Sequence, residues 1–283
     1  MFNGCAYILT VDVGNTFIRF GLFAEDSAAA QERPLATCEI TTPARITADE
    51  ARMRLAQVMG ALAADAGMPG ALVPAAAVLS CAVPALERPW KAALSRTCTG
   101  RVLTVGPGLK TGIPVHYDDP AEIGPDRIAD AVAARAVYGS PCIVIDLGTT
   151  TNIEVIDTHG TFVGGVIAPG LALGARSLSA AAARLPQVEP SAPTHVIGRN
   201  TREAMRSGVV LGEVARIDGM LDMVLAEMRA TKAAGEGDVP IVITGDDAEA
   251  LAALVGHSLT VDDALALRGL AELYRINQKP RRV

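Results

Sequence analysis

Residues 12–16 read Asp-Val-Gly-Asn-Thr, and residues 146–150 read Asp-Leu-Gly-Thr-Thr. Each stretch follows a run of apolar residues typical of a buried strand, and its glycine opens a tight turn into a second, antiparallel strand. The two aspartates stand 134 positions apart, which is nearly half of the 283-residue chain. A repeat at that spacing predicts an α/β fold of two similar domains, residues 1–115 and 116–283, which face each other across a central cleft.

Hydrophobic periodicity and turn residues predict the same order in each half, with strands first and then units of helix and strand. In the first half we expect strands at 7–13, 17–23, 36–40, 75–80 and 102–105, and helices at 46–66 and 86–94. In the second half we expect strands at 142–145, 152–156, 161–166 and 241–244, and helices at 125–138, 200–230, 248–255 and 264–274. The first helix should bury the face that carries Leu55, Val58, Met59 and Leu62. Asn200 is expected to cap its helix, with Glu203 as the capping-box partner.

The composition argues against nucleic-acid binding and against disorder. Half of the residues are apolar, aromatic residues make up 4%, and the formal net charge is −6. An acidic chain with few aromatic residues lacks the basic surface and the stacking side chains that nucleic-acid binding requires. The high apolar fraction and the low density of charge predict a well-filled core.

The cysteines and one uncharged stretch bear on the cellular compartment. The five cysteines are too scattered for a disulfide framework or a zinc site, and they are Cys5, Cys38, Cys81, Cys98 and Cys142. We therefore expect reduced thiols in a cytoplasmic protein. Residues 1–6 lack the pattern of a signal peptide. Residues 66–86 carry no charge, but Pro69, Pro74 and Pro84 would break a membrane helix, so we expect no membrane association.

The first glycine turn has the chemistry of a phosphate site. Gly14 allows the chain to turn tightly and brings backbone N–H groups near an anion, while Asn15 and Thr16 can donate to phosphate oxygens. Asp12 supplies the hard oxygen that Mg²⁺ prefers when it bridges phosphates. An ordinary hairpin turn uses the same residue types, and the second copy at 146–150 is what favours the functional interpretation.

Other phosphate-binding patterns are absent from the sequence. Residues 106–111 read Gly-Pro-Gly-Leu-Lys-Thr, but they lack the spacing and the Gly-Lys pair of a P-loop, so we expect a connecting loop. No Gly-x-Gly-x-x-Gly follows a strand, which argues against a dinucleotide-binding fold.

A third cluster combines residues 117–120, Tyr-Asp-Asp-Pro, with residues 124–127, Gly-Pro-Asp-Arg. Pro125 suits the first turn of a helix, which places Asp126 and Arg127 at its positive end. Asp126 can orient a substrate hydroxyl for attack, and Arg127 can bind a carboxylate or phosphate with two hydrogen bonds. Taken alone, an aspartate at a helix start is also a common cap.

Several linked motifs in one order resemble the type III pantothenate kinases, from about Ile8 to Asn277. The resemblance rests on Asp12-Val13-Gly14-Asn15-Thr16, on residues 106–112, on Tyr117 with Pro120 and Gly124-x-Asp126-Arg127, and on Asp146-x-Gly148-Thr149. It continues in residues 164–170, Ile197-Gly198-x-Asn200-Thr201, Thr244-Gly245 and Leu267-x-Gly269-Leu270.

The resemblance implies a duplicated actin-like, sugar-kinase-like (ribonuclease H-like) ATPase fold and a homodimer. It implies ATP-dependent phosphorylation of pantothenate, with Mg²⁺ and a monovalent cation, K⁺ or NH₄⁺. The nucleotide phosphates would lie over Asp12, Val13, Gly14, Asn15, Thr16, Phe17, Ile18 and Arg19, and Thr149 would also contact ATP. Asp126 would be the general base, and Asp146 would hold the monovalent cation. The pantothenate contacts would be Tyr117, Gly124, Pro125, Asp126, Arg127 and Thr201.

Three residues depart from the family pattern. Pro125 stands where a small residue is usual, Asn152 replaces a threonine, and Asp246 follows Gly245 where a second glycine is usual. Asp246 and Asp247 could repel an anionic nucleotide. Beside an active pantothenate kinase, the departure at Asp246 leaves open a regulatory homologue of the same fold without catalysis. Analogy of fold alone leaves open a related kinase or ATPase with another substrate.

Overall fold

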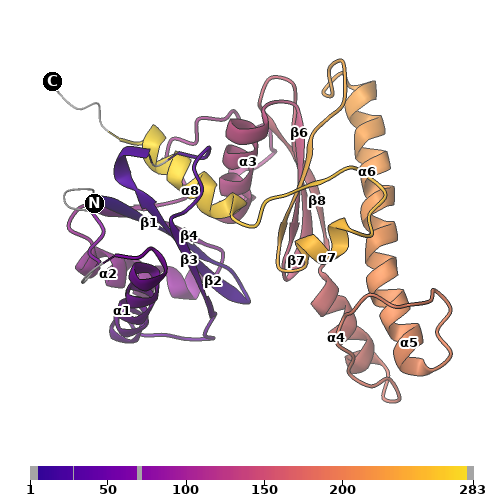
Figure 1. Ribbon diagram of the computed structural model, residues 1–283. Coiled ribbons are helices and arrows are strands. Elements are labelled where there is room, and N and C mark those ends of the chain that lie inside the picture. Colours follow the sequence, from indigo (N-terminus) through magenta and orange to yellow (C-terminus); the bar gives the residue numbers. More distant parts are fainter. Residues whose placement is uncertain (1–5, 28, 69–71, 279–283) are drawn as a thin grey trace. The chain divides into compact units, whose positions relative to one another are not determined.

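The computed structural model describes residues 6–27, 29–68 and 72–278, so Cys5, Pro69 and Gly70 lie outside the described residues (Figure 1). The chain divides into two compact units, Met1–Val137 with Ala264–Val283, and Tyr138–Asp263. The boundary expected between residues 115 and 116 falls inside the first unit, which also takes in the last helix of the chain. The compact units are defined by contacts within the fold, whereas the predicted domains were defined by the repeat in the sequence. The two divisions answer different questions, so the assignment of domains at 1–115 and 116–283 stays a prediction.

The first unit is built on a mixed sheet of five strands in the order β3-β2-β1-β4-β5. The strands are β1 (Tyr7–Val13), β2 (Phe17–Ala24), β3 (Ala36–Thr41), β4 (Ala76–Cys81) and β5 (Val102–Thr104). The central strand β1 pairs antiparallel with β2 and parallel with β4. All seven residues of β1 are buried, as expected for a strand that is covered on both faces.

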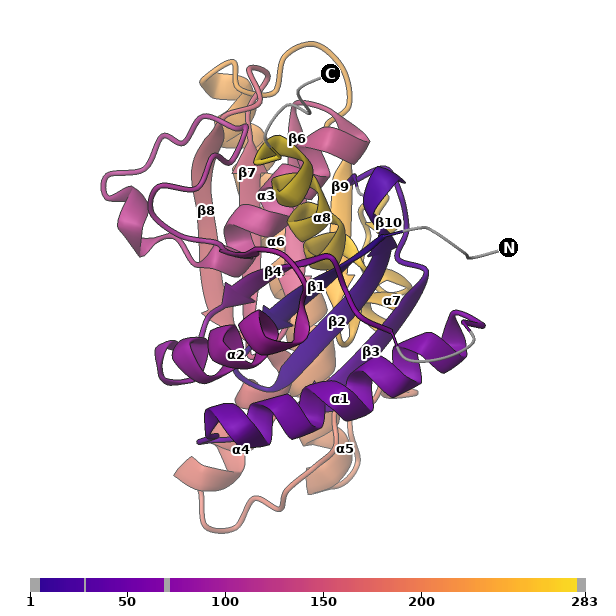
Figure 2. The same cartoon turned by 90° about the vertical axis from the view of Figure 1, so that its left-hand side faces the viewer.

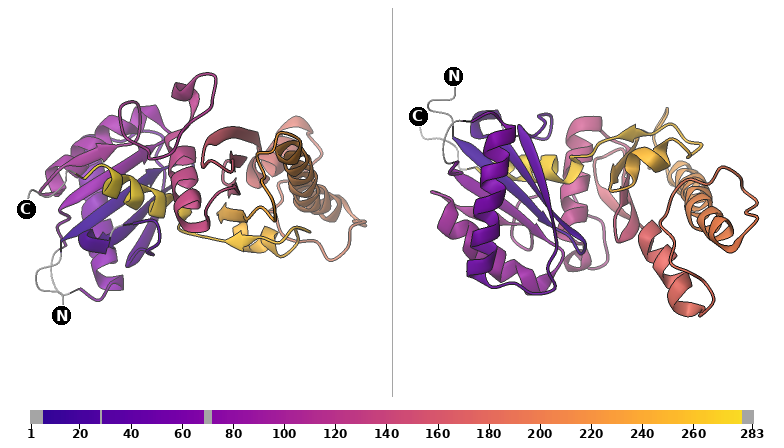
Figure 3. Two further views of the ribbon diagram at one scale, coloured as in Figure 1. Left: turned by 90° about the horizontal axis from the view of Figure 1, so that it is seen from above. Right: turned by 60° about the horizontal axis from the view of Figure 1, so that its bottom comes forward.

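Helices cover both faces of this sheet. The helices that pack on the sheet are α1 (Ala48–Asp65), α2 (Pro84–Thr97) and α8 (Leu265–Ile276). The unit also contains α3 (Pro125–Tyr138), which packs on α8, and 3₁₀ turns at Glu25–Ser27 and Pro120–Glu122. Figure 2 shows α1 and α2 together on one face, and Figure 3 shows α8 on the other. The predicted apolar face of α1 is confirmed, since Leu55, Val58, Met59 and Leu62 are all buried in that core.

The last helix belongs to the first unit because it crosses α3 at very short range. A Cβ atom on Gly269 of α8 would lie 1.9 Å from the carbonyl oxygen of Ala129 in α3, so only glycine fits at this crossing. The neighbouring Leu267 reaches the sheet at Gly21. Leu267 and Gly21, which are 246 positions apart in the sequence, thus share one core.

The second unit repeats the sheet of the first. Its strands are β6 (Cys142–Leu147), β7 (Thr150–Ile156), β8 (Phe162–Pro169), β9 (Ile241–Gly245) and β10 (Thr260–Val261), in the order β10-β9-β6-β7-β8. Here too the central strand pairs antiparallel with the next strand and parallel with a later one. The predicted duplication of one α/β module is therefore confirmed.

The helices of the second unit differ from the predictions in detail. They are α4 (Leu171–Ala181), α5 (Thr201–Arg206), a π-helical segment (Ser207–Leu211), α6 (Gly212–Ala230) and α7 (Ala248–Ala252). The sequence did not predict α4, whose glycine and serine residues obscure its period. Asn200 caps α5 by accepting from the Glu203 N–H at 3.0 Å. The Glu203 carboxylate accepts from the Arg199 N–H, whereas the predicted capping box required the Asn200 N–H as its donor. The reciprocal bond is therefore made with the residue before the cap.

Within the described residues, no helix is both long enough and apolar enough to cross a bilayer. The described cysteines, Cys38, Cys81, Cys98 and Cys142, are free thiols. Burial raises the pKa of Cys81 and Cys98 to about 11, which keeps these thiols protonated and unreactive at neutral pH.

Candidate active site

The first glycine turn joins β1 to β2. Gly14 N–H donates to the Phe17 carbonyl at 3.0 Å, which closes the hairpin. Thr42, just beyond β3, holds the turn from outside: its hydroxyl donates to Gly14 O at 2.7 Å and its N–H donates to Thr16 O at 2.9 Å. Asn15 and Thr16 remain exposed at the tip. The hairpin thus presents two polar side chains on a backbone fixed at both ends.

Asp12 lies in β1 between two polar neighbours from adjacent strands. It is opposite Arg19 in the antiparallel pair and opposite Ser80 in the parallel pair. Burial, and then the negative charge of Asp126, raise the pKa of the Asp12 carboxyl from 3.8 to about 6, while Ser80 and Arg19 oppose that shift. Arg19 itself is paired with Glu39, with Nε 3.0 Å from the carboxylate.

The surroundings of Asp12 fit a divalent cation. The side chain is 6% exposed, and its Oδ1 atom has no hydrogen-bond partner within the described residues. A buried carboxylate oxygen without a donor is unfavourable unless a ligand satisfies it. Mg²⁺ carried by phosphates prefers such hard oxygens, so Asp12 would hold it at the end of β1.

The acceptor side of the candidate site is the start of α3. Asp126 is the second residue of this 14-residue helix, and its Oδ1 accepts from the Arg127 N–H at 3.0 Å. A Cβ atom on Gly124 would lie 2.3 Å from that oxygen, so glycine leaves the space that the carboxylate occupies. Because the charge of Asp126 acts on Asp12, the structure brings the two predicted carboxylates of the first unit together.

The other predicted acceptor residues surround the start of this helix. Pro125 is its first residue, as predicted, where the missing N–H removes no helical hydrogen bond. Arg127 is buried, with 6% exposure, and Tyr117 is half-buried in the segment that leads to the Pro120–Glu122 turn. Arg127 and Tyr117 therefore belong to the same compact unit as Asp126 and Asp12.

The second glycine turn joins β6 to β7 and is tighter. Gly148 N–H donates to Thr150 O at 3.0 Å, and Gly170 N–H donates to Thr149 O at 3.1 Å. Gly170 caps the start of α4, where a Cβ atom would lie 2.3 Å from Gly148 O. The close approach of Gly170 fixes the backbone of Thr149, whose side chain is half-exposed.

Asp146 occupies the same place in β6 that Asp12 has in β1. It is opposite Asn152, whose amide Nδ2 donates to its Oδ2 at 3.5 Å, and Asn152 in turn accepts from the Thr150 hydroxyl at 3.3 Å. In the parallel pair with β9, Asp146 is opposite Thr244. The departure from the family pattern at Asn152 therefore lies directly against the predicted cation ligand.

The acidic pair after β9 lies beside the same turn. Gly245 has φ +101° and would bring a Cβ atom 2.0 Å from Leu147 O, and Asp246 N–H donates to that oxygen at 2.9 Å. Asp246 is exposed, and Asp247 is the N-cap of α7. Burial, and then the charges of Asp246 and Glu213, raise the pKa of Asp247.

The predicted site residues are divided between the units. The first unit holds residues 12–19, Tyr117 and residues 124–127, and the second holds Asp146, Thr149 and Thr201. Thr201 is exposed at the first turn of α5. The sequence reasoning missed Ser80, which lies opposite Asp12 in β4, and Thr42, which holds the first turn from just beyond β3. A polar residue at the end of a buried strand, as in Ala76–Cys81, is the signal that could have identified Ser80.

Comparison with known proteins shows what this arrangement is similar to. The model of the type III pantothenate kinase family matches residues 8–223. Type III pantothenate kinases of Nocardia farcinica and Koribacter versatilis are 40% and 36% identical to the chain. The first alignment covers 97% of this chain and 99% of the relative, and the second covers 96% of each.

Solved structures share the fold at much lower identity. A conserved putative Baf family transcriptional activator from Campylobacter jejuni matches with a TM-score of 0.56 and 18% identity, over 95% of this chain and 98% of that one. A ROK hexokinase from Thermus thermophilus matches with a TM-score of 0.51 and 14% identity, over 96% and 100% of the two chains. These matches show the duplicated sugar-kinase-like, actin-like fold, and the long matches at 36–40% identity go further: the chain belongs to the type III pantothenate kinase family.

Proposed function

We propose that this chain transfers the γ-phosphoryl group of ATP to the 4′-hydroxyl of pantothenate, which is the first step of coenzyme A biosynthesis. The observation that carries the proposal is the pair Asp12 and Asp126, at the end of β1 and the start of α3, with Asp12 buried and its Oδ1 without a donor among the described residues. The negative charge of Asp126 contributes to the raised pKa of Asp12. One carboxylate suits the cation on the phosphates, and the other suits the acceptor hydroxyl. Membership of the family supports the choice of pantothenate.

Asp126 orients the acceptor hydroxyl and receives its proton as the oxygen attacks phosphorus. It lies in the first turn of α3, where the unpaired N–H groups and the helix dipole face the acceptor side of the site. Arg127 is the cation beside Asp126, and its guanidinium can bind the carboxylate of the acceptor through two hydrogen bonds. Tyr117, Gly124, Pro125 and Thr201 are the other pantothenate contacts in this proposal.

The nucleotide phosphates lie against Asp12, Val13, Gly14, Asn15, Thr16, Phe17, Ile18 and Arg19. Mg²⁺, when bound with ATP, neutralises charge on the phosphates. Asp12 holds that ion through its buried Oδ1, which lacks a donor among the described residues. Thr149 contacts ATP, and Asp146 holds a monovalent cation, K⁺ or NH₄⁺.

The proposal also includes a homodimer in the cytoplasm. Exposed apolar side chains on the second unit are consistent with a surface that a second copy covers, since Ile167, Val196 and Ile197 are 60%, 73% and 82% exposed. Light scattering on the purified protein measures the assembly directly. A mass equal to that of one chain would contradict the dimer.

A coupled assay for ADP, run with and without pantothenate, tests the proposed reaction. Turnover that requires pantothenate, Mg²⁺ and either K⁺ or NH₄⁺ is the expected result. Pantothenate-independent hydrolysis would favour a related kinase or ATPase with another substrate. Absence of turnover in a folded protein that still binds ATP would favour a regulatory homologue.

A further inference from the structure

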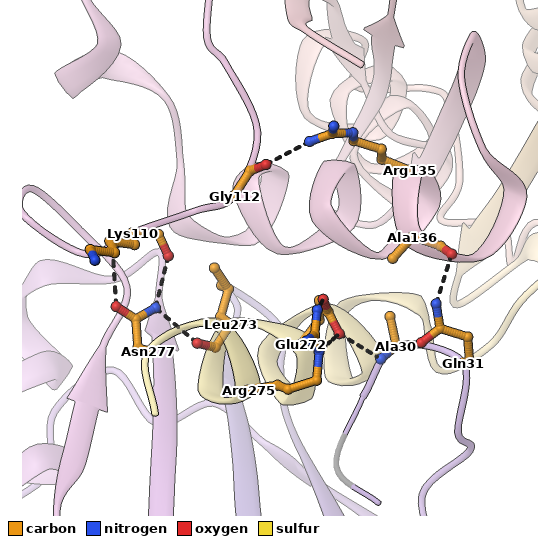
Figure 4. Close-up of polar contacts among 10 residues, drawn as sticks. All are labelled: Ala30, Gln31, Lys110, Gly112, Arg135, Ala136, Glu272, Leu273, Arg275 and Asn277. Atoms are coloured by element: carbon orange, nitrogen blue, oxygen red, sulfur yellow. Dashed lines mark hydrogen bonds and ion pairs between the residues drawn. The ribbon is translucent and has the colours of Figure 1, made fainter. Parts of the chain in front are cut away.

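The loop that leads to Tyr117 is tied to the end of the last helix by one side chain. The Asn277 amide donates through Nδ2 to Lys110 O at 2.8 Å, and its Oδ1 accepts from Lys110 N–H at 3.3 Å. Nδ2 also donates to Leu273 O in the last turn of α8 at 2.9 Å. Asn277 thus satisfies both backbone groups of a loop residue, as a neighbouring strand would, while it stays fixed to its own helix (Figure 4).

A second tether holds the same loop from α3. Arg135 Nη1 donates to Gly112 O at 2.5 Å. Gly112 has φ +75°, and a Cβ atom there would lie 2.7 Å from Ile276 Cδ1, so the loop touches α8 at this glycine as well. Between the tethers, the Thr111 hydroxyl donates to the carbonyl of buried Ile113. Lys110 to Ile113 is therefore fixed on both sides, four residues before Tyr117.

The helix that carries Asn277 is itself anchored in the first unit. At its other end Arg268 Nε donates to Ala30 O at 2.6 Å, and Glu272 Oε2 accepts from Ala30 N–H at 3.3 Å. Gln31 Nε2 donates to Ala136 O of α3 at 2.9 Å, so the same strand connection also ties α3. Tyr274 O–H donates to the Glu25 carboxylate at 2.6 Å. Figure 4 shows α3 and α8 side by side, with the bonds of Glu272 to Ala30 and of Gln31 to Ala136.

We propose that Asn277 is a positioning residue for the acceptor substrate, because it fixes through Lys110 the loop that places Tyr117. This inference rests on the proposed function, which assigns Tyr117 to pantothenate. In this proposal Asn277 acts through the loop and not on the substrate itself. Its effect is to hold a segment of twelve residues between β5 and Tyr117 that forms no helix or strand and would otherwise sample many conformations before binding.

The test compares Asn277→Ala with Tyr274→Phe. Both variants remove side-chain hydrogen bonds from the same end of α8, but Tyr274 is bonded to Glu25 and not to the loop. Asn277→Ala is expected to raise KM for pantothenate about tenfold and to leave KM for ATP within twofold, since one or two hydrogen bonds order the loop. Tyr274→Phe is expected to change neither KM. Equal effects of the two variants on pantothenate would overturn the proposal, because general destabilisation of α8 would then explain them.

Hydrogen exchange supplies a readout that does not depend on activity. In Asn277→Ala, exchange of the amides of residues 109–113 should accelerate at least tenfold, while residues 267–273 keep their protection. Unchanged exchange in the loop would contradict the tether. If Asn277→Ala does not fold, Arg135→Ala takes its place, because it removes the second tether of the loop. The same rise in KM for pantothenate is expected, and an effect equal to that of Tyr274→Phe would again overturn the proposal. If the wild-type chain itself fails to phosphorylate pantothenate, the proposed function fails, and the exchange experiment alone decides the tether.

Discussion

The two Asp-x-Gly turns come from one repeated module, yet they give their aspartates different neighbours. In the first hairpin Asp12 is opposite a residue seven positions later, Arg19, whereas in the second Asp146 is opposite a residue six positions later, Asn152. The parallel partners also differ, with Ser80 beside Asp12 and Thr244 beside Asp146. The duplication thus preserved the place of the aspartate in the central strand and changed what surrounds it.

The difference shows how one motif can acquire two roles. A hairpin that is one residue longer puts a cation opposite Asp12, and Asp12 nevertheless keeps an oxygen without a donor among the described residues. The tighter hairpin puts a neutral amide opposite Asp146 and holds its carboxylate through Oδ2. The first arrangement suits a divalent ion on phosphates, and the second is the one to which the proposed function assigns the monovalent ion.

The strongest test of this contrast compares Asp12→Asn with Asp146→Asn. Asp12→Asn should lower kcat by about 10³-fold at any K⁺ concentration, since a fixed charge near the reacting phosphates is lost. Asp146→Asn should instead raise the K⁺ concentration required for half-maximal activity. Steady-state kinetics over titrations of Mg²⁺ and K⁺ measure both effects. Equal losses with no change in K⁺ dependence would show that the turns share one role.

Asp126→Asn should lower kcat by about 10²-fold or more, because positioned general bases contribute 10²–10⁴. Affinity for ATP should stay within twofold, as Asp126 is assigned to the acceptor. Asp118→Asn is the matched control, since Asp118 is an exposed carboxylate in the same segment of chain. Near-normal turnover in Asp126→Asn would remove this residue from the mechanism.

Asp12→Asn should also stabilise the ligand-free protein above about pH 6. The pKa of Asp12 is raised from 3.8 to about 6, so the folded state binds this proton more tightly than the unfolded state. Stability from this group is therefore present below about pH 4 and is lost as pH rises through 6. A shift of about two units corresponds to up to about 3 kcal/mol at pH 8.

Chemical denaturation in EDTA at pH 4 and pH 8 measures that difference. The gain from Asp12→Asn should be present at pH 8 and absent at pH 4. Asp146→Asn serves as the comparison, since its carboxylate has the amide of Asn152 as a donor. If Asp146→Asn gains as much stability at pH 8 as Asp12→Asn, the two carboxylates destabilise the ligand-free protein equally, and the proposed difference between their environments is wrong.

The smallest expected effect concerns the acidic pair beside the second turn. Asp246→Gly should tighten ATP binding several-fold without a change in pantothenate affinity. Two unit charges about 8 Å apart repel by about 2 kcal/mol at an effective dielectric constant of about 20, and solvent screens most of that at an exposed residue. Asp246→Asn separates loss of charge from gain of backbone freedom. Calorimetric titration with ATP checks both variants, and unchanged affinity in both would rule out the electrostatic explanation.

The sequence predicted the strands and the duplication well because their signals are local. The strand at 7–13 is observed with the bounds expected, and the helix at 125–138 begins at Pro125 as its ring geometry favours. Apolar runs that end at a glycine turn fix the place of Asp12 and Asp146 before any pairing is known. The predicted strand at 152–156 begins two residues earlier, at Thr150, because the second hairpin is tighter than the first.

What the sequence could not provide was contact between distant segments. Ser80 becomes a neighbour of Asp12 only through the parallel pairing of β1 with β4, and Thr42 reaches the turn only because β3 lies beside β2. Asn277 and Lys110 are 167 positions apart. No short window of sequence contains such pairs, so the environment of each carboxylate has to come from the tertiary structure.

The return of α8 to the first unit has a consequence for synthesis of the chain. The second unit is one continuous segment, Tyr138–Asp263, whereas the first is completed only by Ala264–Val283, which is synthesised after the second unit. Until Leu265–Ile276 emerges, the face of β1 and β4 that α8 covers has no apolar partner from this helix, and Gly269 has not reached α3. Completion of the first unit during translation therefore waits for the synthesis of α8, and the second unit can fold before it. A chain cut at residue 263 would leave this apolar face of the sheet exposed.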